Sequence, residues 1–548
     1  MKYPFSLVIF LFAHSVSAQV QPALPAQQIT KLDAISTQDV PPRAPGIATG
    51  VVINGKVVYT KYAGYANLGD SMLIDQRSRF NIASNGKQFT ALAVLILADQ
   101  KKIKLTDDIR TFFPALLPEI PEKISINHLL THTSGIRDVY DLWALQGITW
   151  WKQTFSNEDA FALLLRQREL NFSPGTRYLY SNSNYILLAL LVEKVTGKSF
   201  AEYTNRMFRG LNMPNTSFEP DHGNIRGPVA LPYFNFDTWS TYNWITNIHG
   251  DGNLFSTLND QLVWEQTLQA GSSKTVSARV LKQSQQLSGI TDQYGYGLES
   301  GMHHNIPYRF HEGATGAWKA TVVRFPEKRL SVVTLTNSGK TIPAMQTRQA
   351  ADVILGFESQ PESFATKPAA IGAFVSLDEA VGVYQNENDF TFTFEKRDTS
   401  LFLIRSGRND IRVERESANV FHQWNDPDFK QEFTYNSKHE LQVTAYYTTH
   451  APYTLTKATA NWTGFDFHSL DGTFENEETG TSFTIKYVSG FRYEIVTRDE
   501  TETGTLITPR KLLTGNYALT VTTDASGKVT HILLSGDRIR AVRFARRL

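Results

Sequence analysis

The stretch that decides the fold reads Phe80-Asn81-Ile82-Ala83-Ser84-Asn85-Gly86-Lys87-Gln88-Phe89-Thr90, and an apolar run from Ala91 to Ala98 follows it. Such a run predicts a buried helix that begins close to Ser84. Because side chains three residues apart are neighbours on a helix, Lys87 is expected beside Ser84. A serine next to a cation and a helix start can act as a nucleophile. The alternative is a solvated lysine beside a serine that only caps the helix.

Length and composition narrow the choice of function. The chain has 548 residues, which is enough for several domains. It carries 54 basic and 53 acidic residues and no basic stripe, so nucleic acid is not an expected partner. The absence of cysteine excludes a disulfide scaffold, a thiol nucleophile and a cysteine zinc site. We therefore expect a small peptide, amide or ester as the partner of this protein.

The N-terminus has the pattern of a secretory signal. A basic start at Lys2 precedes the apolar segment Leu7 to Ala13 and the small residues Val16-Ser17-Ala18. This pattern predicts a signal peptide over residues 1–18 and an exported protein, periplasmic or extracellular; an uncleaved membrane anchor is the alternative. No later stretch reaches the ~20 apolar residues of a spanning helix, so no membrane span is expected after signal removal. Residues 19–45 are polar and contain prolines, which is typical of a linker.

Strands are expected both before and after the serine segment. Residues 50–59 form two apolar runs around Asn54-Gly55, the strongest short hairpin signal, so an antiparallel sheet is expected to begin there. His128 and His132 are four residues apart, but the glutamate of a His-Glu-x-x-His motif is missing, which favours packed histidines over a metal site. Further strands are expected at Tyr294 to Leu298, Tyr308 to Glu312, Trp318 to Phe325 and Leu330 to Thr336.

A second candidate segment is Tyr180-Ser181-Asn182, which follows the turn Pro174-Gly175 and precedes an apolar helix. In a turn, Tyr180 and Asn182 can both point into one cleft. A phenol held beside Lys87 would have its pKa lowered by the cation, which would suit Tyr180 as a base toward Ser84. The tripeptide Tyr-x-Asn occurs elsewhere in the chain, so it is not specific alone.

A third candidate segment is His311-Glu312-Gly313-Ala314, in one of the expected strands. Residues two apart in a strand face the same way, so His311 and Gly313 share a face. The glycine would leave room for a ligand backbone, and the N–H just beyond it could donate to an oxyanion. The alternative is a strand histidine with only a structural hydrogen bond.

In this order and spacing, the three segments resemble the motifs of the serine β-lactamase and penicillin-binding superfamily. They look most similar to the group of class C β-lactamases, D-alanyl-D-alanine carboxypeptidases, D-aminopeptidases and esterases. The resemblance extends to Leu129-Leu130-Thr131-His132-Thr133-Ser134-Gly135 and to Gly250-Asp251-Gly252. It covers residues 46–356 and implies an α+β serine hydrolase domain, in which an antiparallel sheet flanked by helices lies beside a helical lobe.

The resemblance also implies roles for the candidate residues. Ser84 would accept the acyl group, Lys87 would activate it, and Tyr180 would be general base and acid. The implied substrate-binding groups are Asn182, His311, Gly313 and the backbone N–H of Ala314, which would form the oxyanion hole with the N–H of Ser84. No metal or organic cofactor is implied.

One departure from the family pattern concerns the third motif. His311 stands where β-lactamases usually carry lysine, and a largely neutral imidazole attracts a substrate carboxylate less than an ammonium does. We therefore expect weak or absent hydrolysis of the β-lactam nitrocefin.

The C-terminal third contains an internal repeat of roughly 90 residues. Leu377-Asp378 with Gly382-Val383-Tyr384-Gln385-Asn386-Glu387 is similar to Leu470-Asp471 with Gly472-Thr473-Phe474-Glu475-Asn476-Glu477. After a linker over residues 357–375, this repeat predicts two small antiparallel β-barrels, over residues 376–460 and 461–548. They resemble the paired lipocalin-like barrels of D-aminopeptidase-type relatives, in which a barrel loop can cover the cleft. The sequence alone does not identify such a loop here.

Four functions fit these observations. The favoured one is an exported serine hydrolase that acts through a Ser84 acyl-enzyme on D-amino-acid peptides or amides. The alternatives are an esterase with the same site, a β-lactamase, and a penicillin- or wall-binding protein whose site has decayed. The substrate and the oligomeric state are left open.

Overall fold

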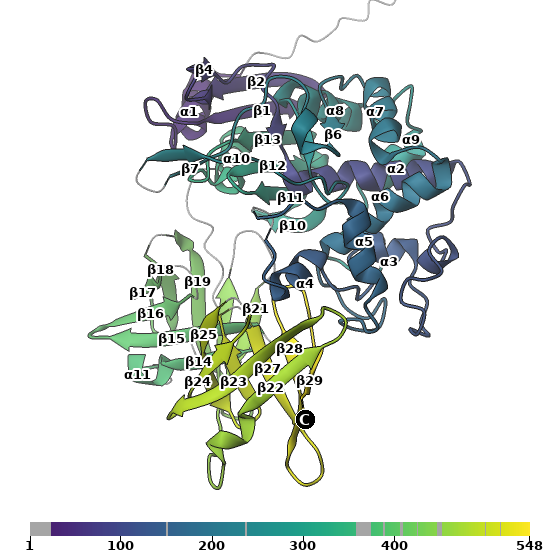
Figure 1. Cartoon of the computed structure of the whole chain (residues 1–548). Coiled ribbons are helices and arrows are strands. Elements are labelled where there is room, and N and C mark those ends of the chain that lie inside the picture. The colour runs from purple at the N-terminus through teal and green to yellow at the C-terminus, as the bar shows by residue number, and fades with distance from the viewer. Residues whose placement is uncertain are drawn as a thin grey trace, which may run out of the picture.

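The computed structural model describes residues 24–149, 152–235, 238–357, 374–386, 390–405, 409–424, 426–446, 452–498, 500–515 and 517–547. The expected signal peptide over residues 1–18 lies outside these residues, as does most of the expected linker over 357–375. Figure 1 shows a mixed domain of sheet and helices followed by two barrels. The predicted fold class is thereby confirmed.

A six-stranded antiparallel sheet forms the centre of the first domain, in the order β10-β11-β12-β13-β1-β2. The expected hairpin is present, because Asn54 and Gly55 both have positive φ in the turn between two of the strands. The strands of this sheet are β1 (Ile47–Ile53), β2 (Lys56–Ala63), β10 (Glu299–His303), β11 (Ile306–Thr315), β12 (Trp318–Phe325) and β13 (Leu330–Thr336). The prediction of a strand from Tyr294 to Leu298 is wrong. Only isolated β-bridges form in this segment, which precedes β10.

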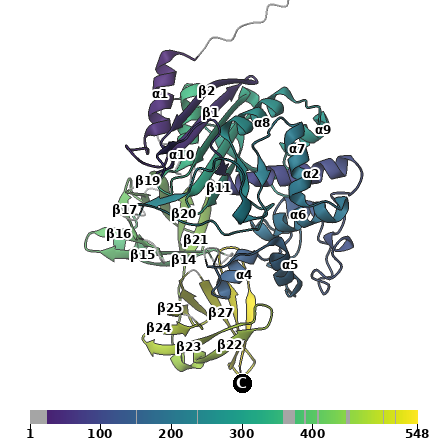
Figure 2. The same ribbon diagram turned by 45° about the horizontal axis from the view of Figure 1, so that its top comes forward.

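Helices cover both faces of the sheet and build the lobe beside it (Figures 1 and 2). Neighbouring strand residues face opposite sides of the sheet. Val332 packs in the apolar cluster toward α1 and α10, and Val333 packs in the cluster toward α2 and α8. The helices are α1 (Ala26–Thr37), α2 (Lys87–Asp99), α3 (Ile126–Leu130), α4 (Val139–Leu145), α5 (Asn157–Leu165), α6 (Asn182–Thr196), α7 (Phe200–Gly210), α8 (Leu258–Ala270), α9 (Ala278–Ser284) and α10 (Pro343–Leu355).

The segment expected to be a linker over residues 19–45 contains α1. This expectation was wrong because the helix is mostly polar and buries only Leu32 and Ser36 fully, so its apolar face is too narrow to stand out in the sequence. It packs on α10 and β2 and therefore belongs to the first domain. None of the helices in the described ranges combines the length and apolar character that crossing a bilayer requires.

Small strands pair around the site and within the segment over residues 217–241. Phe80–Asn81 pairs with Leu254–Ser256, which holds the serine segment against the Gly250-Asp251-Gly252 turn. These short strands are β3 (Tyr65–Asn67), β4 (Met72–Leu73), β5 (Phe80–Asn81), β6 (Ser217–Phe218), β7 (Tyr233–Asn235), β8 (Trp239–Thr241) and β9 (Leu254–Ser256).

Two closed antiparallel barrels of eight strands follow, as the repeat predicted. The repeated glycines Gly382 and Gly472 begin the first strand of each barrel, and Tyr384 and Phe474 are fully buried inside. After α11 (Leu377–Ala380), the first barrel consists of β14 (Gly382–Gln385), β15 (Thr391–Arg397), β16 (Ser400–Ile404), β17 (Ile411–Arg415), β18 (Val420–Gln423), β19 (Asp426–Tyr435), β20 (Leu441–Tyr446) and β21 (Tyr453–Lys457). The second consists of β22 (Gly472–Asn476), β23 (Thr481–Ser489), β24 (Arg492–Val496), β25 (Thr501–Thr508), β26 (Lys511–Thr514), β27 (Tyr517–Thr523), β28 (Val529–Ser535) and β29 (Val542–Arg546).

The two barrels differ in how they join the first domain. The buried residues of the first barrel form an apolar cluster of their own. The buried residues of the second barrel belong to one continuous cluster with the helical lobe, and α4 lies next to this barrel in Figures 1 and 2.

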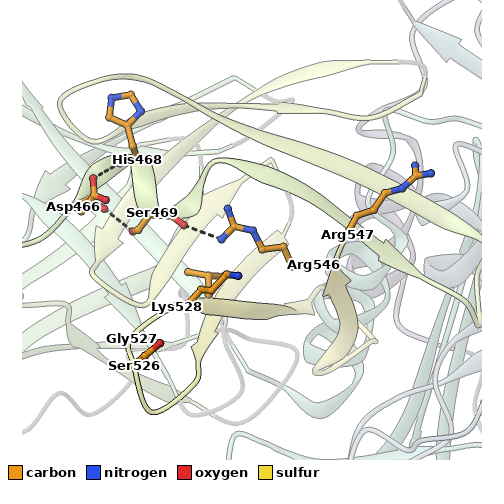
Figure 3. A pocket seen from close by; sticks show the side chains of 9 residues that line it. Asp466, His468, Ser469, Ser526, Gly527, Lys528, Arg546 and Arg547 are labelled. Atoms are coloured by element: carbon orange, nitrogen blue, oxygen red, sulfur yellow. Dashed lines mark hydrogen bonds between the residues drawn. The ribbon is translucent and has the colours of Figure 1, made fainter.

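Elsewhere on the second barrel, a hollow of ≈ 670 Å³ is lined by residues that include Asp466, Lys528 and Arg546 (Figure 3). None of the predicted site residues lines this hollow.

Candidate active site

Ser84 lies in a short 3-10 turn, Ala83–Gly86, that leads directly into α2. Its predecessor Ala83 has a φ of 47°, an unusual value for a residue with a side chain, and the Asn81 side chain accepts a hydrogen bond from the Ala83 N–H at 2.9 Å. The turn leaves Ser84 partly exposed while its neighbours are buried. A substrate can therefore reach the hydroxyl of Ser84.

Lys87 begins α2 and lies beside the serine, as the spacing predicted. Its Nζ donates to the Ser84 Oγ at 3.0 Å, to the Asn182 Oδ1 at 2.9 Å and to the backbone carbonyl of Asp251. The side chain is completely buried, and this desolvation lowers the pKa of Lys87 to about 7, although the Asp251 carboxylate opposes the shift. At neutral pH a large fraction of Lys87 is therefore an uncharged amine next to the serine hydroxyl.

Tyr180 also lies at the serine, but its pKa differs from the prediction. Burial raises the pKa of Tyr180 well above 10, while the Arg538 cation and a hydrogen bond with Ser84 oppose this shift. The Lys87 Nζ contacts the ring, 4.9 Å from its centroid, and His132 packs against the ring at 4.2 Å between centroids. The predicted lowering of the pKa was wrong because buried aromatic neighbours, which the local sequence does not reveal, desolvate the phenol. Tyr180 is a neutral phenol at neutral pH.

Asn182 begins α6 and is held by protein groups at both ends of its amide. Its Oδ1 accepts from Lys87, and its Nδ2 donates to the Asp138 carboxylate at 2.9 Å. The same carboxylate oxygen accepts from the Asn182 backbone N–H at 2.6 Å. In this structure Asn182 therefore positions Lys87, and its predicted contact with a substrate amide stays a prediction.

His311 faces the site from β11 and is uncharged. Its Nδ1 lies 2.7 Å from the Glu312 carbonyl, which can only accept, so Nδ1 carries the proton. Its Nε2 therefore accepts from the Tyr294 hydroxyl at 2.8 Å. Burial, with a smaller effect from Lys87, lowers the pKa of His311 to about 3. The neutral imidazole expected from the sequence is thus present.

Gly313 permits a close approach between β11 and the serine turn. A Cβ on Gly313 would lie 2.2 Å from the Ile82 carbonyl oxygen and 3.1 Å from the Ser84 nitrogen. The expected room for a ligand backbone is therefore filled by the protein's own backbone. This contact brings the Ser84 N–H next to the backbone that continues into Ala314, which is the arrangement that the predicted oxyanion hole needs.

Two acidic residues that are not among the predicted site residues hold the site together. Asp251 accepts a hydrogen bond from the Tyr140 hydroxyl at 3.0 Å, and its pKa is raised by burial and lowered by Lys87. Asp138 is fully buried, caps α4 through the Tyr140 N–H and binds Asn182. The Gly-Asp-Gly sequence was a visible signal for Asp251, whereas nothing local marks Asp138.

The second barrel contributes Arg538, which the sequence did not suggest either. Arg538 lies in the turn between β28 and β29, and its guanidinium carbon lies 5.0 Å from the centroid of the Tyr180 ring. Its charge is one of the causes that lower the pKa of Lys87. A loop of the second barrel therefore reaches Tyr180, one of the predicted catalytic residues.

The two histidines that are four residues apart in the sequence have different surroundings. His128 caps α3 together with Ser125, and His132 lies beyond the end of that helix, so the two do not share a metal-binding face. In the described part of the chain, His303, His304 and Asp352 form the one group whose spacing could hold a metal ion, and they lie at the ends of β10 and α10.

Comparison with known proteins places the first domain in a family. Residues 32–356 match the family described as Beta-lactamase. The chain is 29% identical over 338 residues to a D-aminopeptidase of Cereibacter sphaeroides, covering 59% of this chain and 63% of that protein. It is 34% identical over 215 residues to Protein flp of Staphylococcus aureus, covering 36% of this chain and 42% of that protein. The matched part therefore spans less than two thirds of these curated relatives.

A solved structure shares the fold over more of the chain. It is the octameric penicillin-binding protein homologue from Pyrococcus abyssi, with a TM-score of 0.57 and 23% sequence identity. The match covers 78% of this chain and 100% of that chain. At this level of identity the likeness shows the fold alone.

Proposed function

The chain belongs to the beta-lactamase family, and on this premise we propose that it is an exported serine hydrolase whose Ser84 forms an acyl-enzyme with D-amino-acid-containing peptides or amides. The observation that carries the proposal is the hydrogen bond of 3.0 Å between the Lys87 Nζ and the Ser84 Oγ. It joins the one Ser-x-x-Lys pattern of the chain to an amine whose pKa is about 7. A serine paired with a partly neutral amine is an activated nucleophile.

Acylation follows from the protonation states at the site. The neutral amine of Lys87 takes the proton of Ser84 while Oγ bonds to the substrate carbonyl carbon. The N–H groups of Ser84 and Ala314 stabilise the negative oxygen of the tetrahedral intermediate. The C–N bond then breaks, and the neutral Tyr180 hydroxyl donates its proton to the leaving amine while it takes up the Ser84 proton from the Lys87 ammonium. Because the pKa of Tyr180 is raised, we assign the base role to Lys87 and the proton-donor role to Tyr180.

Deacylation repeats these steps with water. Water attacks the Ser84 ester while the neutral amine of Lys87 removes its proton. The bond between the acyl carbon and the serine oxygen then breaks, and that proton passes to the serine oxygen. The products are the free acid and the regenerated hydroxyl of Ser84.

The substrate class and the export rest on separate observations. A D-aminopeptidase at 29% identity supports an amide with a D-residue. The basic and apolar start from Met1 to Ala18 supports export. A panel of D-alanine p-nitroanilide, a D-Ala-D-Ala peptide and p-nitrophenyl acetate separates an amidase from an esterase.

The test of the shared chemistry is the intact mass after reaction with a fluorophosphonate. We expect a single added label on the wild-type protein and none on Ser84→Ala, because Ser84 is the serine that, among the described residues, accepts a hydrogen bond from a lysine of lowered pKa. Circular dichroism of Ser84→Ala confirms that the fold is kept. An unlabelled wild-type protein would support the binding protein with a decayed site instead.

A further inference from the structure

The hairpin between β10 and β11 has an unusual turn at its tip. His303 at the end of β10 pairs with Ile306 at the start of β11, so the turn consists of His304 and Asn305 alone. Both turn residues have positive φ, 46° for His304 and 60° for Asn305. Glycine and asparagine are the usual residues in such a turn, because a side chain is strained in this region. The hairpin therefore carries a histidine where glycine would be less strained.

This turn brings two imidazole rings to the end of α10, where Asp352 lies in the last turn of the helix. The Nε2 atom of His303 lies 2.6 Å from the Asp352 Oδ1, and the Nε2 atom of His304 lies 3.2 Å from the same oxygen. The three atoms all lie within 4.8 Å of one another. Two elements that are distant in the sequence thus place three metal-ligating groups around one point.

The three side chains are largely enclosed by the protein. The side chains of His303 and Asp352 are 5% and 11% exposed, and that of His304 is 22% exposed. The Phe357 ring stacks on the His304 ring with 4.1 Å between their centroids, and Phe325 packs against His303. Rings that are held by apolar neighbours are oriented before a ligand binds. Solvent reaches the group mainly at His304.

The end of α10 favours a cation at this point. The C-terminus of a helix carries a partial negative charge, which disfavours a carboxylate in the last turn and favours a positive charge. The last turn of α10 contains no basic residue. In the described part of the chain, the ion-pair partners of Asp352 are His303 and His304. Hydrogen bonds from neutral imidazoles would satisfy the carboxylate oxygen but would not balance its charge.

We propose that His303, His304 and Asp352 bind a divalent transition-metal ion, with zinc as the best match, which clamps the tip of the β10–β11 hairpin to the end of α10. Two imidazole nitrogens and one carboxylate oxygen suit zinc, whereas magnesium and calcium prefer oxygen ligands. Ligand atoms of a tetrahedral zinc site are about 3.4 Å apart, so the separations of 2.6 and 3.2 Å open by less than about 1 Å. Water takes the fourth position on the exposed side.

The proposed metal site is separate from the serine site and does not depend on the proposed function. Helix α10 packs on the face of the sheet that bears α1, and α2 with the serine turn packs on the other face. Strand β10 is the edge strand of the sheet, and its neighbour β11 carries His311 and Gly313. The metal ion therefore stabilises the edge of the sheet and takes no part in acyl transfer.

The test measures zinc binding to the full chain, produced without a histidine tag and stripped with EDTA. Isothermal titration with zinc chloride should give about one site per chain. The unfolding temperature should rise with the zinc concentration, because an ion that binds only the folded state stabilises it. The same concentration of magnesium chloride should leave the unfolding temperature unchanged.

Two substitutions remove one ligand each. Asp352→Asn and His304→Asn should weaken zinc binding by at least about 10-fold and abolish the rise in unfolding temperature. His304→Asn should keep the turn, since asparagine tolerates positive φ, and circular dichroism without zinc checks the fold of both variants. His439→Asn is the matched control. His439 is an exposed histidine with a φ of 61° in the turn between β19 and β20, and zinc binding should equal that of the wild type.

Three results overturn the inference: a wild-type protein that binds no zinc, zinc binding that His304→Asn does not weaken, and an equal rise in unfolding temperature with magnesium. If Asp352→Asn does not fold, His304→Asn decides the outcome. Labelling of Ser84 is measured separately from zinc binding. A protein without label on Ser84 that binds zinc through these residues confirms the metal site and overturns only the proposed function.

Discussion

At the residue scale, the decisive property of the site is the protonation of Lys87. Its ammonium form has lost water without gaining a salt bridge, since its acceptors are the Ser84 hydroxyl, the Asn182 amide oxygen and a backbone carbonyl. Neutral acceptors stabilise an ammonium less than a carboxylate would. The lowered pKa is therefore a direct consequence of where the amine is placed.

This placement predicts the pH dependence of activity. A base acts in its deprotonated form, so kcat/KM of an uncharged ester should rise with pH through a midpoint of about 7, which is the pKa of Lys87. The pKa values of Asp141 and Glu299 are also raised, to about 7 and about 8, and could give a similar profile. Stopped assays between about pH 5 and pH 9 measure the midpoint.

Substitutions show which of these groups causes the pH dependence of activity. Asp141→Asn and Glu299→Gln remove the competing groups and should keep the rising limb, whereas Lys87→Ala should lower kcat/KM about 100-fold or more. In Arg538→Gln the midpoint should move to higher pH, because the Arg538 cation contributes to the lowered pKa of Lys87. A profile that disappears in Asp141→Asn would reject Lys87 as the titrating base.

His311 gives a second prediction at this scale. The imidazole is uncharged because its Nδ1–H binds the Glu312 carbonyl, its Nε2 accepts from Tyr294 and its pKa is about 3. It offers no positive charge to the carboxylate of a β-lactam at the third motif. Nitrocefin hydrolysis should therefore be slow at every pH above about 5, measured from the absorbance change of the opened ring. Rapid and saturable hydrolysis would contradict this account.

The sequence predicted those contacts of single residues that depend on local geometry. Ser84 and Lys87 meet because three residues separate them on one turn, and the Asn54-Gly55 hairpin forms because its two residues favour positive φ. The pKa of Tyr180 could not be predicted, since it depends on how closely distant aromatic side chains enclose the phenol. The contact of His132 with its ring is one such packing contact.

At the element scale, the site depends on how tightly β11 lies against the serine turn. The two backbones are so close at Gly313 that a methyl group would overlap the Ile82 carbonyl at 2.2 Å. Backbone on both sides leaves little freedom to relax. The position of the Ser84 N–H relative to Ala314 is therefore fixed by packing of backbone on backbone.

Gly313→Ala tests this contact. We expect the substitution to destabilise the protein by about 1–3 kcal/mol and to lower kcat about 100-fold with a smaller change in KM, because the oxyanion donors would be displaced. Urea unfolding and ester kinetics measure the two effects. Gly69→Ala is the matched control, since Gly69 is exposed and a Cβ there would meet only the Asn67 side chain at 3.3 Å. An active Gly313→Ala protein would show that the close approach is not required.

Element boundaries show where sequence patterns fail. The strands β11, β12 and β13 have the apolar residues of a sheet packed on both faces and could be predicted. The segment from Tyr294 to Leu298 is equally apolar, but its glycines let it form single bridges instead of a strand. Helix α1 was missed for the opposite reason, because it packs on the sheet through few apolar side chains.

At the scale of the whole molecule, the two barrels differ in their relation to the site. The second barrel brings Arg538 beside Tyr180, whereas the first barrel has an apolar core of its own. Nothing in the sequence could place Arg538 beside Tyr180, because this requires the barrel to dock on α4 and on the turn before it. The two barrels share a short repeated motif, which predicted their fold but not which of them would dock. The difference lies in interface residues such as Glu478, which stands outside the repeated motif.

The docking contact centres on a buried cation. Arg137 is 1% exposed, and its guanidinium pairs with Glu478 of the second barrel at 2.9 Å and with the half-exposed Glu169 at 3.3 Å. Burial raises the pKa of Glu478, and Arg137 opposes this shift. Removing the Glu478 charge leaves Arg137 with one carboxylate partner, the half-exposed Glu169, which is costly for a buried charge.

The last prediction concerns cooperative unfolding. Because the second barrel shares one apolar core with the first domain and the first barrel has its own, calorimetry should resolve two transitions. Esterase activity should disappear with the transition that includes the second barrel. Glu478→Gln should destabilise that transition by about 1–3 kcal/mol and leave the other unchanged. The control is Asp378→Asn in the first barrel, whose pair with Lys396 is 77% and 35% exposed and should contribute little. If Glu478→Gln instead shifted a transition that leaves esterase activity intact, the second barrel would unfold separately, and Arg538 could not be held at Tyr180 by a common core.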